Sequence, residues 1–335
     1  MNMKGFSICI AGLLLISLFS CRPEPRKVMF QGETQGTYYA VTYFDPEGRD
    51  FQTKIDSILR AFDLSVSMWV PESIISKLNY GDSLVQTDDW FVDIFRGSVE
   101  IAEKTGGAFD FTVGPLVNAW GFGFKGKRKM SQAIVDSLLQ YVDYKMVSLD
   151  SRNRIIKPAA VRFDFNAIAQ GYSVDVLGDF LTSNGVENYL VDIGGEVLGK
   201  GCKPGQIPWL VGIENPAADS LSERSINTKV KLTGKALATS GNYRKYYEED
   251  GIRYSHTIDP KTGYPVRHNL LSVSVLANDC ATADGYATAF MVMGYEKARA
   301  FVEGDPELEA FFITDGGSGL FLTHATEGFE EIIEE

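Results

Sequence analysis

The sequence predicts an α+β fold in which antiparallel sheets carry inserted helices. Stretches with strand character come mostly in adjacent pairs, and this order favours antiparallel pairing over a doubly wound parallel sheet. No G-x-G-x-x-G follows a strand and no G-x-x-x-x-G-K-[ST] occurs, so a Rossmann or P-loop nucleotide site is not expected. The 335 residues suffice for a large core in one or two lobes.

The composition is that of an ordinary globular protein with an acidic balance. Hydrophobic residues make up 44% and charged residues 23%, and the formal net charge is −12. Because no basic stripe occurs, we do not expect a nucleic-acid partner. Cys202 and Cys280, the only cysteines after Cys21, lack metal-ligand spacing, and the sequence leaves open whether they pair.

Residues 1–20 are predicted to be a signal peptide. Lys4 precedes an apolar run over 8–19 that is too short for an ordinary transmembrane helix. The run ends in Leu-Phe-Ser-Cys, which resembles a bacterial lipobox, although Phe fits loosely at the second position. We therefore expect lipid attachment at Cys21, with residues 21–28 as a tether, and a mature protein anchored to a membrane of the bacterial cell envelope, facing the periplasm. The alternative is an ordinary signal peptide with an incidental cysteine.

The main domain is expected over residues 29–326, and its first half holds a strand pair and several helices. The strand pair lies in 29–44, where Gly36 indicates a close backbone approach or a bulge. Glycine and aromatic residues over 106–123 favour a shaped loop. Hydrophobic spacing and end signals predict helices at 52–64, from 71–73 to 79, at 88–104 and at 131–139, and a strand hairpin over 147–156.

The second half alternates strands with helices and ends in an acidic tail over 327–335. We expect strands at 161–165, 189–193, 210–214, 230–239, 272–277, 310–314 and 319–323, and helices at 166–183, 281–293 and 295–301.

A hairpin over 240–265 carries one of the three histidines. Its outgoing arm is 243–247, an Asp-Gly turn lies in 248–251, and the returning strand is 253–258. His256 on that strand can act as a general base near neutral pH. The alternative interpretation is a polar strand residue without chemistry.

Asp284 and Thr288 lie four residues apart, so both oxygens project from one face of the expected helix at 281–293. Hard oxygen ligands of this kind suit Mg²⁺. The alternative is a carboxylate near the helix start and a threonine bonded back to the backbone.

Two loops could receive a ligand. Asp164 precedes a helix start, where backbone N–H groups favour an anion, and it could accept hydrogen bonds from a heterocycle or a ribose; alternatively, Asn166 is only a helix cap. The Gly107–Asp110 loop could admit a flat ring close to the backbone. Its alternative is a plain loop that ends a helix.

Seven stretches, in order, resemble the ApbE family of FAD:protein FMN transferases and cover almost all of the mature chain. They are QGTYYAV (35–41), SMWVPESIISKLN (67–79), TGGAFDFTVGPLVNAWGFG (105–123), DFNAIAQGYSVD (164–175), NYLVDIGGEV (188–197), ATSGNYRKYYEEDGIRYSHTIDPKTGYP (238–265) and ADGYATAFMVMG (283–294).

This resemblance implies a compact two-lobed fold, FAD as substrate and Mg²⁺ as metal. Mg²⁺ would be held by the backbone carbonyl of Ala167 and the side chains of Asp284 and Thr288. Gln35 stands where Met is usual, and Gln170 stands where Lys or Glu is usual, so the second position lacks a charge near the ligand. FAD would lie against Gln35, Trp69, Ala108, Phe109, Asp110, Asp164, Gln170, His256 and Ile258.

The implied reaction transfers FMN from FAD to a Thr or Ser hydroxyl of an acceptor protein, expected to be a membrane redox subunit, and releases AMP. Asp284 and His256 would be the catalytic residues, with His256 taking the hydroxyl proton or steadying the phosphate. Two other functions remain open from the sequence: an FAD pyrophosphatase that uses the same metal site, and a flavin-binding lipoprotein without turnover.

Overall fold

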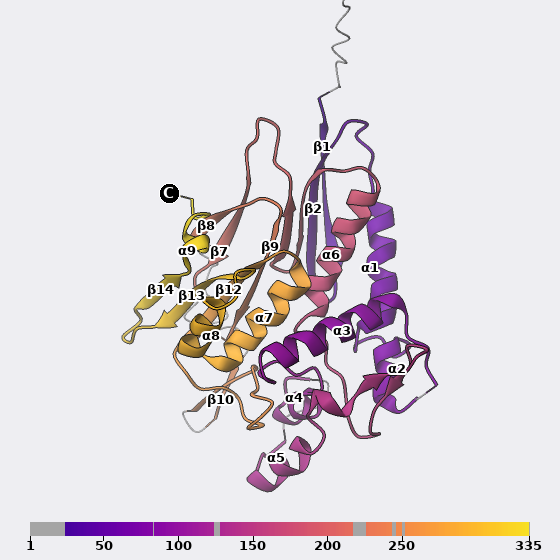
Figure 1. The fold of residues 1–335 in the computed structure, drawn as a ribbon, viewed down its shortest axis with the longest axis vertical. Coiled ribbons are helices and arrows are strands. Elements are labelled where there is room, and N and C mark those ends of the chain that lie inside the picture. Colours follow the sequence, from indigo (N-terminus) through magenta and orange to yellow (C-terminus); the bar gives the residue numbers. More distant parts are fainter. Residues whose placement is uncertain are drawn as a thin grey trace, which may run out of the picture.

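An eight-stranded antiparallel sheet is the framework of the molecule (Figure 1). The computed structural model describes residues 24–82, 84–123, 128–216, 226–242, 246–249 and 252–334. Along the sheet the strands are β1 (Arg26–Thr34), β2 (Thr37–Asp45), β5 (Asn188–Ile193), β6 (Glu196–Lys200), β9 (Lys235–Gly241), β12 (Leu270–Ala277), β13 (Glu309–Asp315) and β14 (Phe321–Ala325). The predicted α+β class with antiparallel sheets is confirmed.

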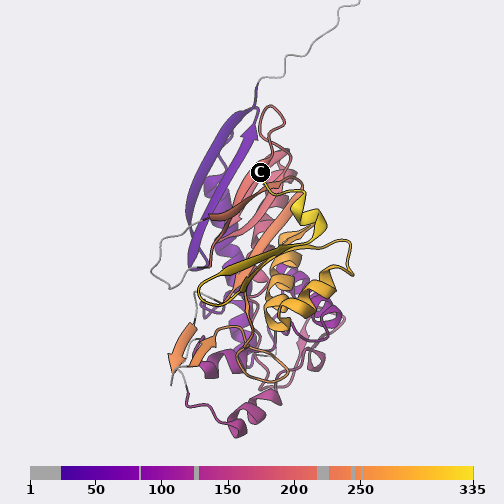
Figure 2. The same ribbon diagram turned by 90° about the vertical axis from the view of Figure 1, so that its left-hand side faces the viewer.

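Helices cover one face of this sheet (Figures 1 and 2). The long helices are α1 (Gln52–Val66), α3 (Asp89–Lys104), α6 (Ala169–Ser183) and α7 (Cys280–Met293), and α8 (Tyr295–Val302) follows the last of them. Alternate side chains of β2 and β5, such as Val41 and Val191, are buried against Leu59 of α1 and Leu177 of α6. Every second residue of these strands therefore packs against the apolar faces of α1 and α6 in one core layer.

The opposite face is covered by a ribbon of two strands and by the end of the chain. The ribbon consists of β7 (Trp209–Glu214) and β8 (Ile226–Leu232), and the short helix α9 (Glu327–Glu330) lies beside it. Trp209 and Phe329 pack with Leu237 of β9 and Ile313 of β13. The strands β12 and β13 are thus buried on both faces.

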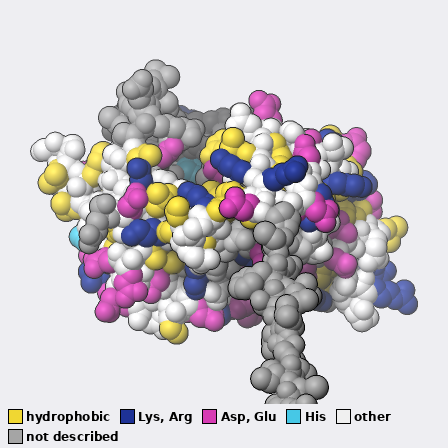
Figure 3. Space-filling view, turned by 90° about the horizontal axis from the view of Figure 1, so that it is seen from above, with side chains coloured by type: hydrophobic (Ala, Val, Ile, Leu, Met, Phe, Trp, Pro, Cys, Tyr) yellow, Lys and Arg dark blue, Asp and Glu magenta, His cyan; other side chains and the backbone are white. Residues whose placement is uncertain are grey.

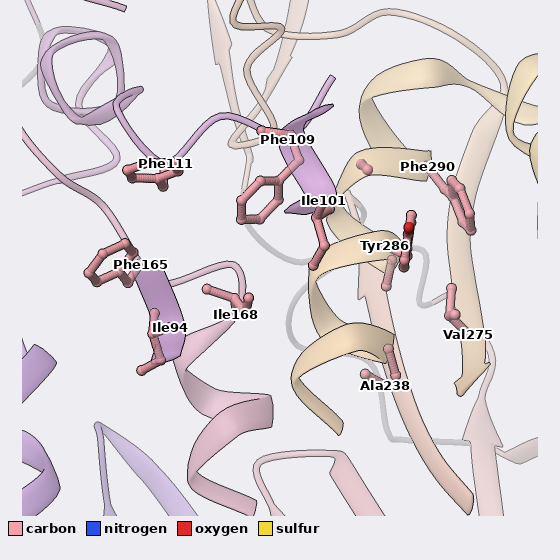
Figure 4. Packing of buried hydrophobic residues seen from close by; sticks show 14 of the residues in the cluster. Ile94, Ile101, Phe109, Phe111, Phe165, Ile168, Ala238, Val275, Tyr286 and Phe290 are labelled. Carbon is pink, nitrogen blue, oxygen red and sulfur yellow. The ribbon is translucent and has the colours of Figure 1, made fainter. Parts of the chain in front are cut away.

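The largest core cluster joins α3, α7 and the loops between them (Figure 4). Ile94 and Ile101 come from α3, Phe109 from the loop that follows it, and Tyr286 and Phe290 from α7. Because α7 also packs on β9 and β12, this cluster fixes the helix that carries the expected metal ligands against the sheet.

The end of the molecule away from β1 is built from short elements (Figure 1). A small cluster there joins Trp120, Val135 and Ile258, and the Trp120 indole donates to the Gly263 carbonyl at 2.8 Å. The short elements of the chain are α2 (Ile74–Tyr80), α4 (Gly114–Trp120), α5 (Gln132–Leu139), the 3-10 turn Tyr144–Met146, and the strand pairs β3 (Ser148–Leu149) with β4 (Ile155–Ile156) and β10 (Tyr246–Glu249) with β11 (Ile252–Ser255).

Three local expectations are wrong. Gln35 and Gly36 form neither a bulge nor a close approach but the two-residue turn between β1 and β2, with φ of 51° and 76°. The glycine-rich stretch contains the helix α4, because Pro115 occupies its first turn and Gly121 ends it in a left-handed conformation. Residues 161–165 form no ladder strand and contribute only one isolated bridge, Val113 to Arg162.

One strand was missed, and the single strand expected over 230–239 divides between β8 and β9, which belong to different sheets. The sequence did not indicate β6, which pairs with β5 and β9. The expected tether 21–28 overlaps β1, which begins at Arg26. The expected acidic tail is not free either, because Phe329 is fully buried and Glu334 N donates to the Lys229 carbonyl at 2.8 Å.

Cys202 and Cys280 are both free thiols, so the two do not form a disulfide. The predicted signal peptide and Cys21 lie outside the described residues. Within the described part of the chain, no helix is long and apolar enough to span a bilayer. On the described surface seen from above, Lys and Arg side chains are interspersed with Asp and Glu (Figure 3).

Candidate functional site

The site is organised by a close contact between α6 and α7. A Cβ at Gly171 on α6 would lie 2.3 Å from the Cys280 carbonyl oxygen and 2.8 Å from Asp284 Cβ, so only glycine fits there. At this contact the Gly171 N–H donates to Asp284 Oδ2 at 3.0 Å. The carboxylate of Asp284 is therefore held in a fixed place, with one oxygen engaged by the backbone.

The Ala167 carbonyl lies just outside the hydrogen-bond ladder of α6. The helix begins at Ala169 with Ile168 as its N-cap, so Gly171 is in the first turn, where a backbone N–H has no intrahelical partner and can donate to Asp284. Among the described residues none donates to the Ala167 oxygen, whereas the Tyr172 N–H donates to the Ile168 carbonyl at 2.9 Å. A backbone carbonyl and a buried carboxylate are both hard oxygen ligands of the kind that Mg²⁺ prefers.

Thr288 lies one turn after Asp284 on α7. Its hydroxyl is 3.3 Å from Ser240 Oγ, near the end of β9. Ser240 was not singled out from the sequence as a site residue, since only the packing of α7 on β9 brings the two hydroxyls together. Thr288 thus offers a neutral oxygen on the same helix face as the carboxylate.

Among the described residues, no Lys, Arg or His side chain forms an ion pair with Asp284. Burial raises the pKa of Asp284 to about 7, although the Gly171 N–H opposes this shift. No group of three or more His, Cys, Asp or Glu side chains that could hold a metal occurs in the described part of the chain. A metal here would therefore be held by one carboxylate, a carbonyl and a hydroxyl, a hard-oxygen set that fits Mg²⁺ completed by substrate and water.

Gln170 is tied to the protein by its amide nitrogen. Nε2 donates to the Ile193 carbonyl at 2.9 Å and also to Glu196 Oε2. Gly194 in the turn after β5 makes room for this amide, because a Cβ there would lie 2.5 Å from Nε2. With both amide hydrogens engaged, Gln170 can offer a flavin only its carbonyl oxygen as an acceptor.

Gln35 sits at the β1–β2 turn and points a polar group inward. Ser173 Oγ donates to Gln35 Oε1 at 3.4 Å, while Nε2 is buried and lacks a partner among the described residues. A buried amide without a partner is costly, so Gln35 Nε2 is a donor that a ligand can satisfy.

Asp164 is positioned through its backbone and by a distant asparagine. Its N–H donates to the Phe111 carbonyl at 2.8 Å, and its Oδ1 accepts from Asn166 N at 3.0 Å. Asn79, the last but one residue of α2, pairs with both backbone groups of Phe163: Oδ1 accepts at 2.7 Å and Nδ2 donates at 2.9 Å. Burial raises the pKa of Asp164.

The Ala108–Asp110 loop turns its larger side chains inward. Phe109 is 2% exposed and belongs to the main core. Asp110 accepts from Thr112 N at 2.8 Å, from Thr112 Oγ1 at 2.6 Å and from Tyr144 N at 3.0 Å, so its carboxylate holds the loop. Any contact of this loop with a flavin is left to its backbone and to the Ala108 methyl group.

The remaining predicted contacts lie on exposed or connecting segments. Trp69 is 66% exposed in the turn between α1 and α2. His256 does not lie within a strand as expected, because β11 ends at Ser255; the half-buried ring lies edge-on to Phe122, with centroids 6.3 Å apart. Ile258 is buried and bridges to Pro265 across the second turn.

The structure therefore brings the start of α6, with Gln170 and Gly171, against Asp284 of α7, whereas Thr288, one turn later, lies against Ser240 of β9. Ala167 and Asp164 precede the start of α6 in the chain. Glu196 and Asn79 were missed. Both act through partners distant in the sequence, which spacing rules do not detect.

Comparison with known proteins gives a consistent result. The ApbE family model matches residues 35–312. The FAD:protein FMN transferase of Vibrio cholerae is 34% identical over 345 residues, which cover 99% of this chain and 100% of the relative, and that of Haemophilus influenzae is 33% identical, with 99% of each chain covered.

Solved structures agree with these relatives. The flavin transferase ApbE from Vibrio cholerae is 33% identical with a TM-score of 0.81, and the match covers 92% of this chain and 99% of that chain. The apo form of the Pseudomonas stutzeri flavinyl transferase ApbE is 34% identical with a TM-score of 0.82, covering 92% and 97%.

Proposed function

The chain belongs to the ApbE family and is an FAD:protein FMN transferase, and we propose that it works with a Mg²⁺ ion and a Thr or Ser acceptor. In this proposal, the hydroxyl oxygen of an acceptor protein attacks the FMN-side phosphorus of FAD. A new phosphoester bond forms, the pyrophosphate bond to the adenylate breaks, and AMP leaves. The acceptor is a membrane redox subunit.

One observation carries the metal part of the proposal. The Gly171 N–H holds the Asp284 carboxylate at the first turn of α6, the Ala167 carbonyl just before that turn accepts no hydrogen bond from the described residues, and the Thr288 hydroxyl lies one turn after Asp284 on α7. These three groups would hold Mg²⁺. When bound, the ion supplies positive charge for the pyrophosphate oxygens, on which negative charge grows during transfer.

His256 takes the proton of the acceptor hydroxyl or steadies the phosphate. It follows directly on β11 and precedes the closed turn in which Gly263 N donates to the Asp259 carbonyl at 2.8 Å. A half-buried imidazole has access to substrate and can change its protonation near neutral pH.

The flavin contacts are proposed from the site as described. Gln35 offers an unsatisfied donor, Asp164 a buried carboxylate, and Gln170 an acceptor oxygen. Trp69 offers an exposed aromatic surface for stacking. The backbone of the Ala108–Asp110 loop and the segment from His256 to Ile258 complete the set.

Mass spectrometry of an acceptor peptide tests the proposal. The full-length protein is incubated with FAD, Mg²⁺ and a Thr-containing peptide, with the Thr→Val peptide as control. A gain of one FMN on the Thr peptide alone is expected. Free FMN and AMP without labelled peptide would indicate the pyrophosphatase, and unchanged FAD would indicate a binding protein without turnover.

A further inference from the structure

Glu196, the first residue of β6, is a buried carboxylate that the proposed reaction does not yet use. Its side chain lies at the turn after β5 and is almost fully enclosed. Its Oε2 accepts from Gln170 Nε2, and the second hydrogen of that amide goes to the Ile193 carbonyl at 2.9 Å. The hydrogen bond holds Glu196 toward the N-terminal turn of α6.

The dipeptide Gln170–Gly171 connects Glu196 to Asp284. The side chain of Gln170 binds one carboxylate, and the backbone N–H of the next residue binds the other at 3.0 Å. Helix α7 also packs on β6, so the contact is supported by the fold. Two buried acids from different elements therefore face the same turn of α6.

Both carboxylates are held by neutral donors alone. Within the described part of the chain, neither Glu196 nor Asp284 forms an ion pair with Lys, Arg or His. A divalent cation near both carboxylates would supply the positive charge that no described side chain gives them.

We propose that Glu196 is a second carboxylate behind the divalent-cation site and strengthens cation binding through its charge. The inference rests on the metal site of the proposed function and adds to it a residue outside the set Ala167, Asp284 and Thr288. Glu196 is a positioning residue in this scheme, since it acts on the cation and on Gln170 rather than on the reacting atoms.

Binding of Mn²⁺ alone to EDTA-treated full-length protein tests this. Electron paramagnetic resonance counts free Mn²⁺ during titration. The Glu196→Gln variant keeps the size of the side chain and an acceptor oxygen but removes the charge. We expect its Mn²⁺ affinity to fall about 10- to 100-fold, the range seen when residues behind metal ligands are changed. The affinity for FAD measured without metal should change by less than about twofold, because the proposed flavin contacts remain.

Asp192→Asn is the matched control. Asp192 is a nearby carboxylate on β5 whose oxygens accept from Gly195 N at 3.0 Å and Tyr38 Oη at 3.1 Å, away from Gln170. Its neutralisation should leave Mn²⁺ affinity within about threefold of wild type, well short of the loss expected on removing a residue behind the ligands.

Glu196→Asp separates charge from shape. It keeps the charge and should retain most of the affinity. An equal loss in Glu196→Asp and Glu196→Gln would assign the effect to the Gln170 hydrogen bond and overturn the proposal, as would wild-type affinity in Glu196→Gln.

The experiment also covers an unfolded variant and a wild-type protein that does not bind Mn²⁺. If Glu196→Gln does not fold, as judged by thermal unfolding in EDTA, Glu196→Ala takes its place: it also removes the charge and should weaken Mn²⁺ binding at least tenfold, and unchanged affinity would overturn the proposal. Failure of the wild-type protein to bind Mn²⁺ would instead contradict the metal part of the proposed function.

Discussion

At this site, hydrogen bonds within the protein occupy some polar atoms of each residue and leave others available to a ligand. Asp284 accepts the Gly171 N–H from the first turn of α6, and the Ala167 carbonyl lies just before that helix. Gln170 gives both amide hydrogens to the protein and keeps an acceptor. The chemistry proposed for the chain depends on the oxygens that these hydrogen bonds leave available.

Asp284→Asn should abolish turnover and preserve much of the flavin affinity. The carboxylate supplies a charge that Mg²⁺ needs, whereas an amide supplies only a neutral oxygen. Thr288→Val should be milder because water can replace one neutral ligand, and His256→Ala should slow transfer with nearly unchanged Mg²⁺ affinity. Activity measured against Mg²⁺ concentration for the three variants checks this order. Wild-type turnover of Asp284→Asn at wild-type Mg²⁺ concentrations would return Asp284 to a structural role.

Asn79→Ala should weaken FAD binding although Asn79 lies outside the proposed contacts. Its side chain makes two hydrogen bonds, 2.7 and 2.9 Å long, to the backbone of Phe163, next to Asp164. Each lost bond costs about 1 kcal/mol of stability, and the freed loop should raise KM for FAD more than it lowers kcat.

Asn184→Ala is the control for this change. Asn184 also bonds to a backbone carbonyl, that of Phe180 at 2.8 Å, but at the far end of α6. Steady-state kinetics with FAD compare the two variants. Equal effects of both substitutions on KM would show that Asn79 acts only through global stability.

The sequence predicted residues of this site where local spacing carries the information. Asp284 and Thr288 share a helix face, which made them a candidate pair, and the family resemblance implied their role. Glu196 and Asn79 escaped because their partners, Gln170 and Phe163, are 26 and 84 residues away. The role of such residues depends on tertiary packing and not on the local pattern.

At the scale of elements, the packing of α6 against α7 determines where the site residues lie. The two helices touch where Gly171 meets Cys280 and Asp284, and Asp175 of α6 accepts from the first N–H groups of α7, Cys280 N and Ala281 N, both at 2.8 Å. The start of α7 is thus fixed by α6 as well as by its own cap, Asp279.

Gly171→Ala should destabilise the protein and weaken Mg²⁺ binding together. The new methyl group would overlap the Cys280 carbonyl and push α7 away, at a cost of about 1–3 kcal/mol or more. Gly97→Ala on α3 is the control, because its nearest atom is Ile168 Cδ1 at 3.6 Å and helical alanine is favoured over glycine. Urea unfolding and metal titration report both effects, and a Gly171→Ala protein as stable as Gly97→Ala would refute the close contact.

The metal-free protein should lose stability as pH rises from about 4 to 7. Burial raises the pKa of Asp175 to about 7 from its ordinary value of 3.8, so between these values the folded protein keeps a proton that the unfolded chain has already released. The contribution is present at low pH and is lost as pH rises through 7, by at most about 1.4 kcal/mol per pH unit. Urea unfolding in EDTA measures this slope. Asp175→Asn should flatten it, and an equal slope in both proteins would contradict the assignment.

Helices and strands were predicted well where the hydrophobic pattern is regular. They were predicted poorly where the backbone hydrogen-bonds to a side chain or where glycines obscure the pattern. The long helices and most sheet strands follow their hydrophobic patterns. Residues 161–165 have strand character, but Asn79 takes the backbone groups of Phe163 and no ladder forms. The short α4 was hidden by its glycines, although Gly121 in fact ends it.

At the scale of the whole molecule, the chain enters at one edge of the sheet. Strand β1 is the first in the order β1-β2-β5-β6-β9-β12-β13-β14, and it lies at the opposite end of the molecule from α5 (Figures 1 and 2). The sheet therefore begins close behind Cys21. Five Cα steps separate Cys21 from Arg26, a span of at most about 18 Å.

Cys21→Ala should release the protein from the membrane fraction without loss of activity in solution. The apolar run ending at Cys21 predicts lipid attachment, and the site residues all come after β1 in the chain. A short tether would hold β1 toward the membrane and leave the contact of α6 with α7, deep in the fold, unaffected. Fractionation of cells after a salt wash, with assay of the soluble protein, tests this. A variant that stays in the membrane fraction would contradict the lipid anchor, and a soluble but inactive variant would show that the anchor acts on the site itself.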